Sequence, residues 1–213
     1  MKKLLLTFAL MTTLSGCQSA YYSAMEKVGI HKRDILVDRV EDTKEAQQQS
    51  QQEFQSALER LTTLINFDGK ELQAAYDQLN SDYEASKKAA EDVSNNINKV
   101  EDVAEALFNE WQDELEQYNN ASMKRESAKK LDQTKRQFDK LLRSMRASET
   151  KMTPVLSALK DNVLYLKHNL NAQAIAAIRG EFSNLKRDIE RLITEMDRSI
   201  ADSNRFIAQM NQE

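Results

Sequence analysis

The stretch from Leu72 to Trp111 reads LQAAYDQLNSDYEASKKAAEDVSNNINKVEDVAEALFNEW, and it decides the fold. Apolar or small residues recur in it at alternating spacings of four and three: Leu72, Tyr76, Leu79, Tyr83, Ser86, Ala90, Val93, Ile97, Val100, Ala104, Leu107 and Trp111. A period of about 3.5 residues keeps one seam of a helix facing a partner helix, as in a coiled coil. The stretch contains neither glycine nor proline, so nothing in it interrupts a helix. It therefore predicts one long helix that buries a narrow face.

Three further seams with the same spacing flank this one. They are Leu36, Val40, Thr43, Gln47, Ser50, Phe54, Ala57, Leu61 and Leu64; then Leu131, Thr134, Phe138, Leu141, Met145, Ser148, Met152, Val155 and Leu159; and last Ile175, Ile178, Phe182, Leu185, Ile189, Leu192, Met196, Ser199, Ser203, Phe206 and Met210. We therefore expect an all-α fold, an elongated antiparallel coiled coil or four-helix bundle. Heptads alone leave open whether the helices pair within the chain or with a second copy.

Short polar breaks separate these helices. One break covers residues 66–69, where Asp68 is expected to cap the next helix. A second covers residues 118–122 with Ser122 as the expected cap, and a third covers residues 168–171.

The third seam contains a proline. Pro154 is expected either to kink that helix or to restart it with Thr153 as the cap.

Charge predicts how two of the helices pair. Residues 101–116 carry seven acidic and no basic side chains, whereas residues 123–146 carry nine basic and three acidic ones. Folding the chain back at residues 119–120 places these segments side by side, and each exposed pair then contributes a few tenths of a kcal/mol. The expected pairs are Glu116 with Arg125, Glu105 with Arg136, and Glu101 with Lys140.

The tip of this hairpin is expected to stand beyond its neighbours. A helix of about 50 residues is about 75 Å long at 1.5 Å per residue, and the first helix is shorter. The N-terminus leaves from the same end. A short helical prelude ends at Gly29, and four of its residues are expected to cover Leu107 and Trp111: Tyr21, Tyr22, Met25 and Val28.

The start of the chain carries a targeting signal. Two lysines and a short apolar run lead to Leu14-Ser15-Gly16-Cys17, the small-residue pattern of a lipobox. Cys17, the single cysteine, is the expected site of lipidation; an ordinary secretory signal with a chance cysteine is the alternative. We predict a signal peptide at 1–16, a lipidated linker with a short helix at 17–33, and a long-helix domain at 34–213.

Residues around the lipidation site also predict a location. Gln18 is not the aspartate that commonly retains lipoproteins in the inner membrane, so the periplasmic face of the bacterial outer membrane is expected. No apolar run after Leu14 is long enough to span a bilayer, so the lipid must anchor the chain. Without Lys2 and Lys3, the 30 basic residues become 28 against 34 acidic ones, a net charge of −6. Such a charge argues against binding nucleic acid.

Four segments of the chain resemble a known family. They are Ile35–Val40, Asn66–Gly69, Glu101–Phe108 and Leu166–Ala172. On these segments the chain resembles a proteobacterial family catalogued only as domain of unknown function 2959. The resemblance implies a helical envelope lipoprotein and brings no substrate, cofactor or catalytic residue.

Residues that could perform chemistry are sparse. His31 and His168 lie far apart, and no cysteine or histidine spacing suits a metal, so we expect no cofactor, no metal site and no enzyme. Trp111 and Tyr118 are the candidate contacts with a partner or a membrane, although the seam position of Trp111 between Leu107 and Leu115 favours a role in core or tip packing. The polar stretch Thr43, Gln47 and Ser50 in the first seam is expected to fix the register, or else to mark where the bundle opens.

The sequence therefore predicts a structural spacer, adaptor or scaffold in the cell envelope. Its expected partners are the membrane, through the lipid, and an unidentified envelope protein; a second copy of the chain, in a homo-oligomer, is the further candidate. The alternative is a membrane- or lipid-interacting protein whose helical hairpins engage the bilayer.

Overall fold

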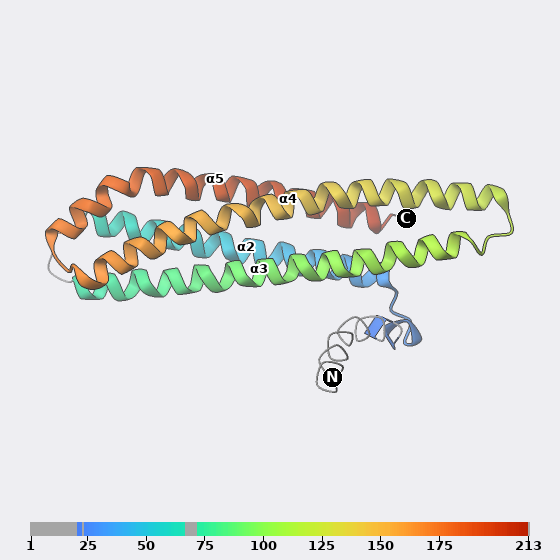
Figure 1. Ribbon diagram of the computed structural model, residues 1–213, viewed down its shortest axis with the longest axis horizontal. Coiled ribbons are helices and arrows are strands. Elements are labelled where there is room, and N and C mark those ends of the chain that lie inside the picture. Colours follow the sequence, from blue (N-terminus) through green and yellow to red (C-terminus); the bar gives the residue numbers. More distant parts are fainter. Residues whose placement is uncertain (1–20, 23, 67–71, 213) are drawn as a thin grey trace, which may run out of the picture.

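The computed structural model describes residues 21, 22, 24–66 and 72–212. Four long helices account for most of them: α2 (Lys32–Ile65), α3 (Leu72–Leu115), α4 (Ala121–His168) and α5 (Ala172–Met210). They run alternately up and down in one elongated bundle (Figure 1). The predicted all-α bundle of long helices is confirmed. Within the described ranges, no helix is apolar over a length that could cross a membrane.

The helices close into a ring. α2 packs against α3 and α5, and α4 packs against the same two helices. Each helix therefore has two neighbours, and its apolar seam points at the common axis.

The four predicted seams form the core. Every predicted seam residue of α2 and α4 is buried, and so are those of α5 apart from Phe182, which is half-buried. In α3, the half-buried exceptions include Leu107 and Trp111, while Phe108 takes the buried position. An α-helix has 3.6 residues per turn, so its face drifts by about 20° per heptad from a strict seam. Over the length of α3 this drift moves the seam by one residue.

Asparagines begin the two C-terminal helices. The Asn120 Oδ1 accepts hydrogen bonds from the backbone N–H groups of Ser122 (2.9 Å) and Met123 (3.2 Å), so it caps α4. The prediction of Ser122 as the cap is wrong, because Ser122 already lies in the first helical turn. Asn171 caps α5 in the same way, accepting from Ala174 N at 3.0 Å. The predicted Asp68 cap lies outside the described residues.

α4 runs unbroken through Pro154, so the prediction of a restart at Thr153 is wrong. Proline removes the hydrogen bond to the carbonyl four residues earlier, which belongs to Thr150. Both Pro154 and Thr150 are exposed, and water can therefore replace the missing donor.

The acidic and basic segments do face each other, but not in the predicted pairs. Lys124 pairs with Glu116 at 3.0 Å, and Arg146 pairs with Glu101 at 2.6 Å. Arg146 also donates to Asn98, so its long side chain spans about one turn of the neighbouring helix. The remaining predicted partners lie elsewhere: Arg136 pairs with Asp132 of its own helix, and Lys140 pairs with Asp202 of α5.

The α3–α4 hairpin extends beyond the start of α2 and the end of α5, as predicted (Figure 1). Two contacts mark where the shorter helices stop. Lys32 at the start of α2 pairs with Glu110, and Arg33 donates to the carbonyl of Met210 at the end of α5.

Candidate functional site

The segment that precedes α2 is bound to the flank of the bundle; residues 21, 22 and 24–30 are called the strap. Residues 24–27 are helical, and a Schellman turn ends them. In this turn Ile30 N donates to Met25 O and Gly29 N donates to Glu26 O, both at 3.0 Å. Gly29 has φ +84°, a left-handed conformation that other residues adopt only with strain. The turn reverses the chain so that the strap lies back along α2.

Lys32 fastens the strap to the bundle. Its ammonium pairs with Glu26 of the strap and with Glu110 of α3, at 2.9 Å from the latter. The same ammonium lies 6.0 Å from the ring centroid of Tyr22, a buried residue of the core. The hydrogen bond from Lys32 lowers the pKa of Glu26. Lys32 also bonds to Glu110, but there the effect of burial is larger, so the pKa of Glu110 is raised.

The strap covers α3 only in part. Tyr22 and Met25 pack against the core, but Val28 is 71% exposed, so the prediction that Val28 helps to cover Leu107 and Trp111 is wrong. A groove of about 190 Å³ remains beside those two residues, and Arg33 and Met210 border it. Valine follows the last helical turn of the strap, and its side chain therefore faces outward.

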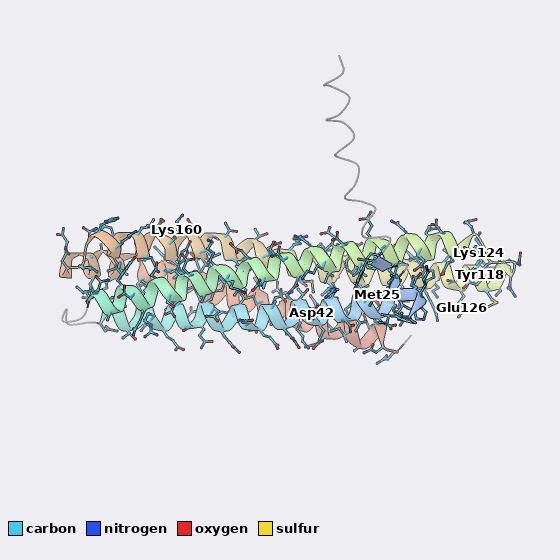
Figure 2. All side chains as sticks on the ribbon, turned by 90° about the horizontal axis from the view of Figure 1, so that it is seen from below. Met25, Asp42, Tyr118, Lys124, Glu126 and Lys160 are labelled. Atoms are coloured by element: carbon cyan, nitrogen blue, oxygen red, sulfur yellow. The ribbon has the colours of Figure 1, made fainter. Side chains whose placement is uncertain are left out.

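The two predicted contact residues have different surroundings. Trp111 is half-buried, and its indole Nε1 donates to Ser127 Oγ at 2.8 Å, which ties α3 to α4. Tyr118 is 38% exposed at the hairpin tip, close to Lys124 and Glu126 (Figure 2). Met123, which the sequence analysis did not select, is 56% exposed in the same hairpin. Tyr118 is thus exposed at the tip, whereas Trp111 is half-buried and borders the groove beside the strap.

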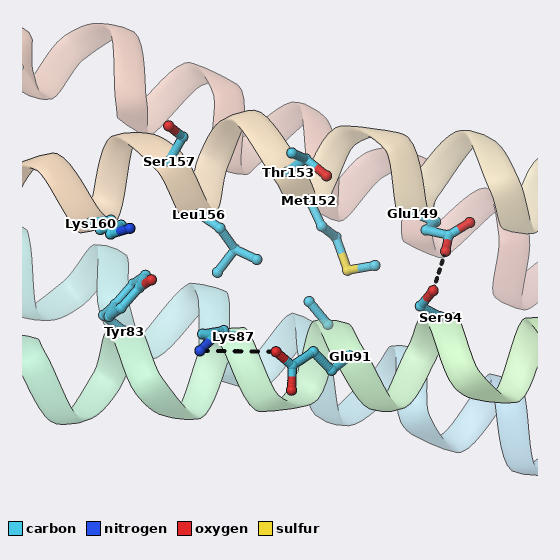
Figure 3. A pocket seen from close by; sticks show the side chains of 11 residues that line it. Tyr83, Lys87, Glu91, Ser94, Glu149, Met152, Thr153, Leu156, Ser157 and Lys160 are labelled. Carbon is cyan, nitrogen blue, oxygen red and sulfur yellow. Dashed lines mark hydrogen bonds and ion pairs between the residues drawn. The ribbon is translucent and has the colours of Figure 1, made fainter.

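A groove of about 450 Å³ lies between α3 and α4 (Figure 3). Met152 and Leu156 line it with apolar surface, and Ala90 is the short side chain facing them from α3. At one end Ser94 donates to Glu149 at 2.5 Å. Burial alone would raise the pKa of Glu149, but its bonds from Ser94 and Arg146 outweigh burial and lower it. The sequence analysis did not predict this groove; the short Ala90 side chain in the α3 seam is the signal that could have indicated it.

Residues 21–210 match a family described as a protein of unknown function, DUF2959. The chain belongs to this family. The resemblance seen in the sequence is thereby confirmed at the level of the family. No curated protein and no solved structure gives a significant match.

The DUF2959 bundle has a polar layer at its centre. Gln47 of α2 is fully buried, and its Nε2 donates to Ser148 Oγ of α4 and to Ser199 Oγ of α5, both at 2.9 Å. Its Oε1 has no hydrogen-bond partner. One turn away, Ser50 Oγ donates to Met152 Sδ at 3.6 Å. The predicted polar layer therefore joins three helices through one amide.

Residues for other chemistry are not gathered in the described part of the DUF2959 chain. His31 precedes α2 at the strap, whereas His168 ends α4 at the other end of the bundle. Among residues 21, 22, 24–66 and 72–212, no three acidic, histidine or cysteine side chains are placed to hold a metal ion. Cys17 and the predicted signal peptide 1–16 lie outside the described residues. α2 begins at Lys32, close to the predicted boundary between 17–33 and 34–213.

Proposed function

We propose that this DUF2959 protein is anchored by lipid at Cys17 on the periplasmic face of the outer membrane, where its bundle acts as a rigid spacer or adaptor. The lipobox Leu14-Ser15-Gly16-Cys17 supports the anchor, and Gln18 supports the outer membrane. A bundle whose polar outer faces remain free can offer partner proteins a long side surface.

The observation that carries the proposal is the docked strap. Anchoring alone needs only a flexible linker, which leaves the direction of the attached domain undefined. Here Tyr22 is buried and Lys32 joins Glu26 to Glu110, so the strap, which begins four residues after Cys17, belongs to the folded body. Because the strap is fixed to the bundle, it restricts the direction in which the bundle leaves the proposed anchor, as a spacer or adaptor requires.

We further propose that the role is not catalytic. In the groove between α3 and α4, Glu91 pairs with Lys87 and Glu149 pairs with Arg146, so both carboxylates already have cationic partners. A general acid or base needs a carboxyl group free to exchange a proton with a substrate.

Lipidation is tested by isolating the protein from cells and measuring the mass of its N-terminal peptide. The proposal expects a peptide that starts at Cys17 and carries acyl chains, in a protein that fractionates with the outer membrane. Cys17→Ser should abolish both results, and Ser19→Ala is the matched control that should keep them. A mature protein with an unmodified Cys17 thiol would support the ordinary secretory signal instead.

The adaptor role is tested by photocrosslinking in intact cells from exposed positions along α3 and α5. The proposal expects one protein to be captured from one face of the bundle. Leu61→Asp, which places a charge at a fully buried position, should abolish that capture by unfolding the bundle. Adducts to lipid alone would contradict the adaptor role.

A second candidate function is a bundle whose hairpins open and engage the bilayer. The unpartnered Gln47 Oε1 favours it, because an unsatisfied buried carbonyl weakens the closed state by about 1–3 kcal/mol. This candidate expects the unlipidated domain to bind vesicles at physiological salt. A domain that leaves such vesicles free of protein contradicts it.

A further inference from the structure

Among the described residues, exposed large apolar side chains lie only at the two ends of the bundle. Those at the strap end are Tyr21, Val28, Ile30, Tyr118 and Met123. Those at the opposite end are Leu164, Tyr165 and Leu170. Within the described part of the chain, the flanks between them expose no large apolar side chain, and the apolar surface there is confined to grooves such as the one at Met152 and Leu156.

Chain length decides which end can meet a membrane. Cys17 precedes Tyr21 by four residues, which span at most about 14 Å when fully extended. Lys32 holds the strap at Glu110, and α3 ends at Leu115, five residues or about 7.5 Å farther along the helix and three residues before Tyr118. Leu72, at the opposite end of α3, is 38 residues and about 57 Å from Glu110. A lipid on Cys17 therefore enters the bilayer at the strap end.

The attachment of the strap also sets the inclination of the bundle. The Tyr22 ring lies 6.0 Å from the Lys32 ammonium, so the strap is held on the flank of the bundle, and the hairpin tip extends beyond it (Figure 1). A lipid attached through four residues therefore leaves the bundle beside the tip rather than at it. Lipid and tip meet one bilayer most readily when the bundle leans.

We propose that the strap and the α3–α4 hairpin tip form one membrane-contact surface, which meets the headgroups of the bilayer holding the Cys17 lipid and tilts the far end of the bundle away. The inference rests on the proposed lipidation. Tyr118 suits the membrane–water interface, because its ring is apolar and its hydroxyl is polar. Val28 and Ile30 add apolar surface between the lipid and the tip.

The test uses the mature lipidated protein reconstituted in phosphatidylethanolamine–phosphatidylglycerol vesicles that contain a lipid-linked energy acceptor. A donor dye is placed on Gln117→Cys at the tip or on Gln173→Cys at the start of α5; both positions are exposed, and Cys17 is blocked by its lipid. The 48-residue α4 separates them by about 72 Å. We expect strong quenching of the donor at position 117 and no quenching of the donor at position 173. Equal quenching at both positions, as from a bundle lying flat, would overturn the proposal, and so would quenching at 173 alone.

A pair of matched variants tests the surface itself. Val28→Ser/Tyr118→Ser/Met123→Ser removes apolar groups from the proposed surface, and Leu164→Ser/Tyr165→Ser/Leu170→Ser removes a similar set from the opposite end. All six side chains are exposed, so both proteins should fold. We expect the first variant to lose quenching at 117 and the second to retain it. Unchanged quenching in the first variant would overturn the proposal.

Failure of the proposed function has a separate signature. A protein that lacks acyl mass and washes off the vesicles refutes lipidation, and with it the membrane-contact surface. A protein that keeps its acyl mass but shows no difference between positions 117 and 173 refutes the contact surface alone.

Discussion

Two layers of the core, about 10 to 15 Å apart along the helices, are built on opposite rules. In one, Phe138 packs edge-on against Phe108 at 5.5 Å and against Phe206 at 6.1 Å between ring centroids. In the other, Gln47 hydrogen-bonds to Ser148 and Ser199, and its carbonyl oxygen is left without a partner. Both layers join three helices. The aromatic layer supplies stability, whereas the amide layer supplies specificity of alignment at a cost in stability.

The largest expected effect comes from breaking the aromatic layer. Phe206→Ala should lower the free energy of unfolding by about 3–5 kcal/mol, because it removes a buried ring and leaves a cavity. Urea unfolding followed by circular dichroism measures this change. A loss below about 1 kcal/mol would mean that the layer collapses around the missing ring or contributes little.

A smaller effect is expected from removing one hydroxyl of the amide layer. Ser148→Ala deprives Gln47 Nε2 of one acceptor while the bond to Ser199 remains, so a loss of about 0.5–1.5 kcal/mol is expected from the same urea experiment. Ala147→Ser, on the adjacent exposed position of α4, is a control that should change stability little. A loss of stability comparable to that of Phe206→Ala would contradict the view that the aromatic layer contributes more to stability than the amide layer.

Replacing the amide itself should separate stability from alignment. Gln47→Leu removes two hydrogen bonds but also the unpartnered carbonyl, so the free energy of unfolding should change by less than about 1 kcal/mol. The number of backbone amide resonances should rise as alternative registers become populated. A variant that is clearly less stable yet keeps a single set of resonances would contradict the alignment role.

The smallest expected effect depends on pH and concerns the border of the amide layer. Glu149 follows Ser148, and its lowered pKa means that its ionised form stabilises the fold above the ordinary value of 4.5. That contribution is lost as the pH falls through the lowered pKa. Wild type should therefore lose more stability than Glu149→Gln between neutral pH and acid, as thermal unfolding at several pH values would show. Identical pH profiles of the two proteins would show that Glu149 does not contribute to the pH dependence of stability.

The sequence predicted what repeats along the chain. Seam spacing located Gln47, Ser148 and Ser199 inside the bundle, since burial follows directly from a helical period. It missed the exchange of Leu107 for Phe108, because drift from 3.5 to 3.6 residues per turn accumulates only over a long helix.

Pairings between helices were less predictable. Glu101 was expected to pair with Lys140 but pairs with Arg146. Exposed ion pairs with alternative partners about one or two turns apart have nearly equal free energies, so the sequence does not determine which pair forms. The strap was foreseen as a short helix ended by Gly29. Its attachment through Lys32 depends on three segments that come together only in the folded chain, so no local pattern indicates it.

The closed ring of helices has a consequence for how the protein is made. α5 follows the other three helices along the chain and is the one that joins α4 back to α2. A chain that has so far extended only to α4 leaves the buried stripes of α2 and α4 uncovered on one side, including Phe138 and Phe54. Until α5 arrives, the emerging polypeptide is a substrate for chaperones and prone to self-association. Completion of the last helix is therefore the step that commits the polypeptide to its native state.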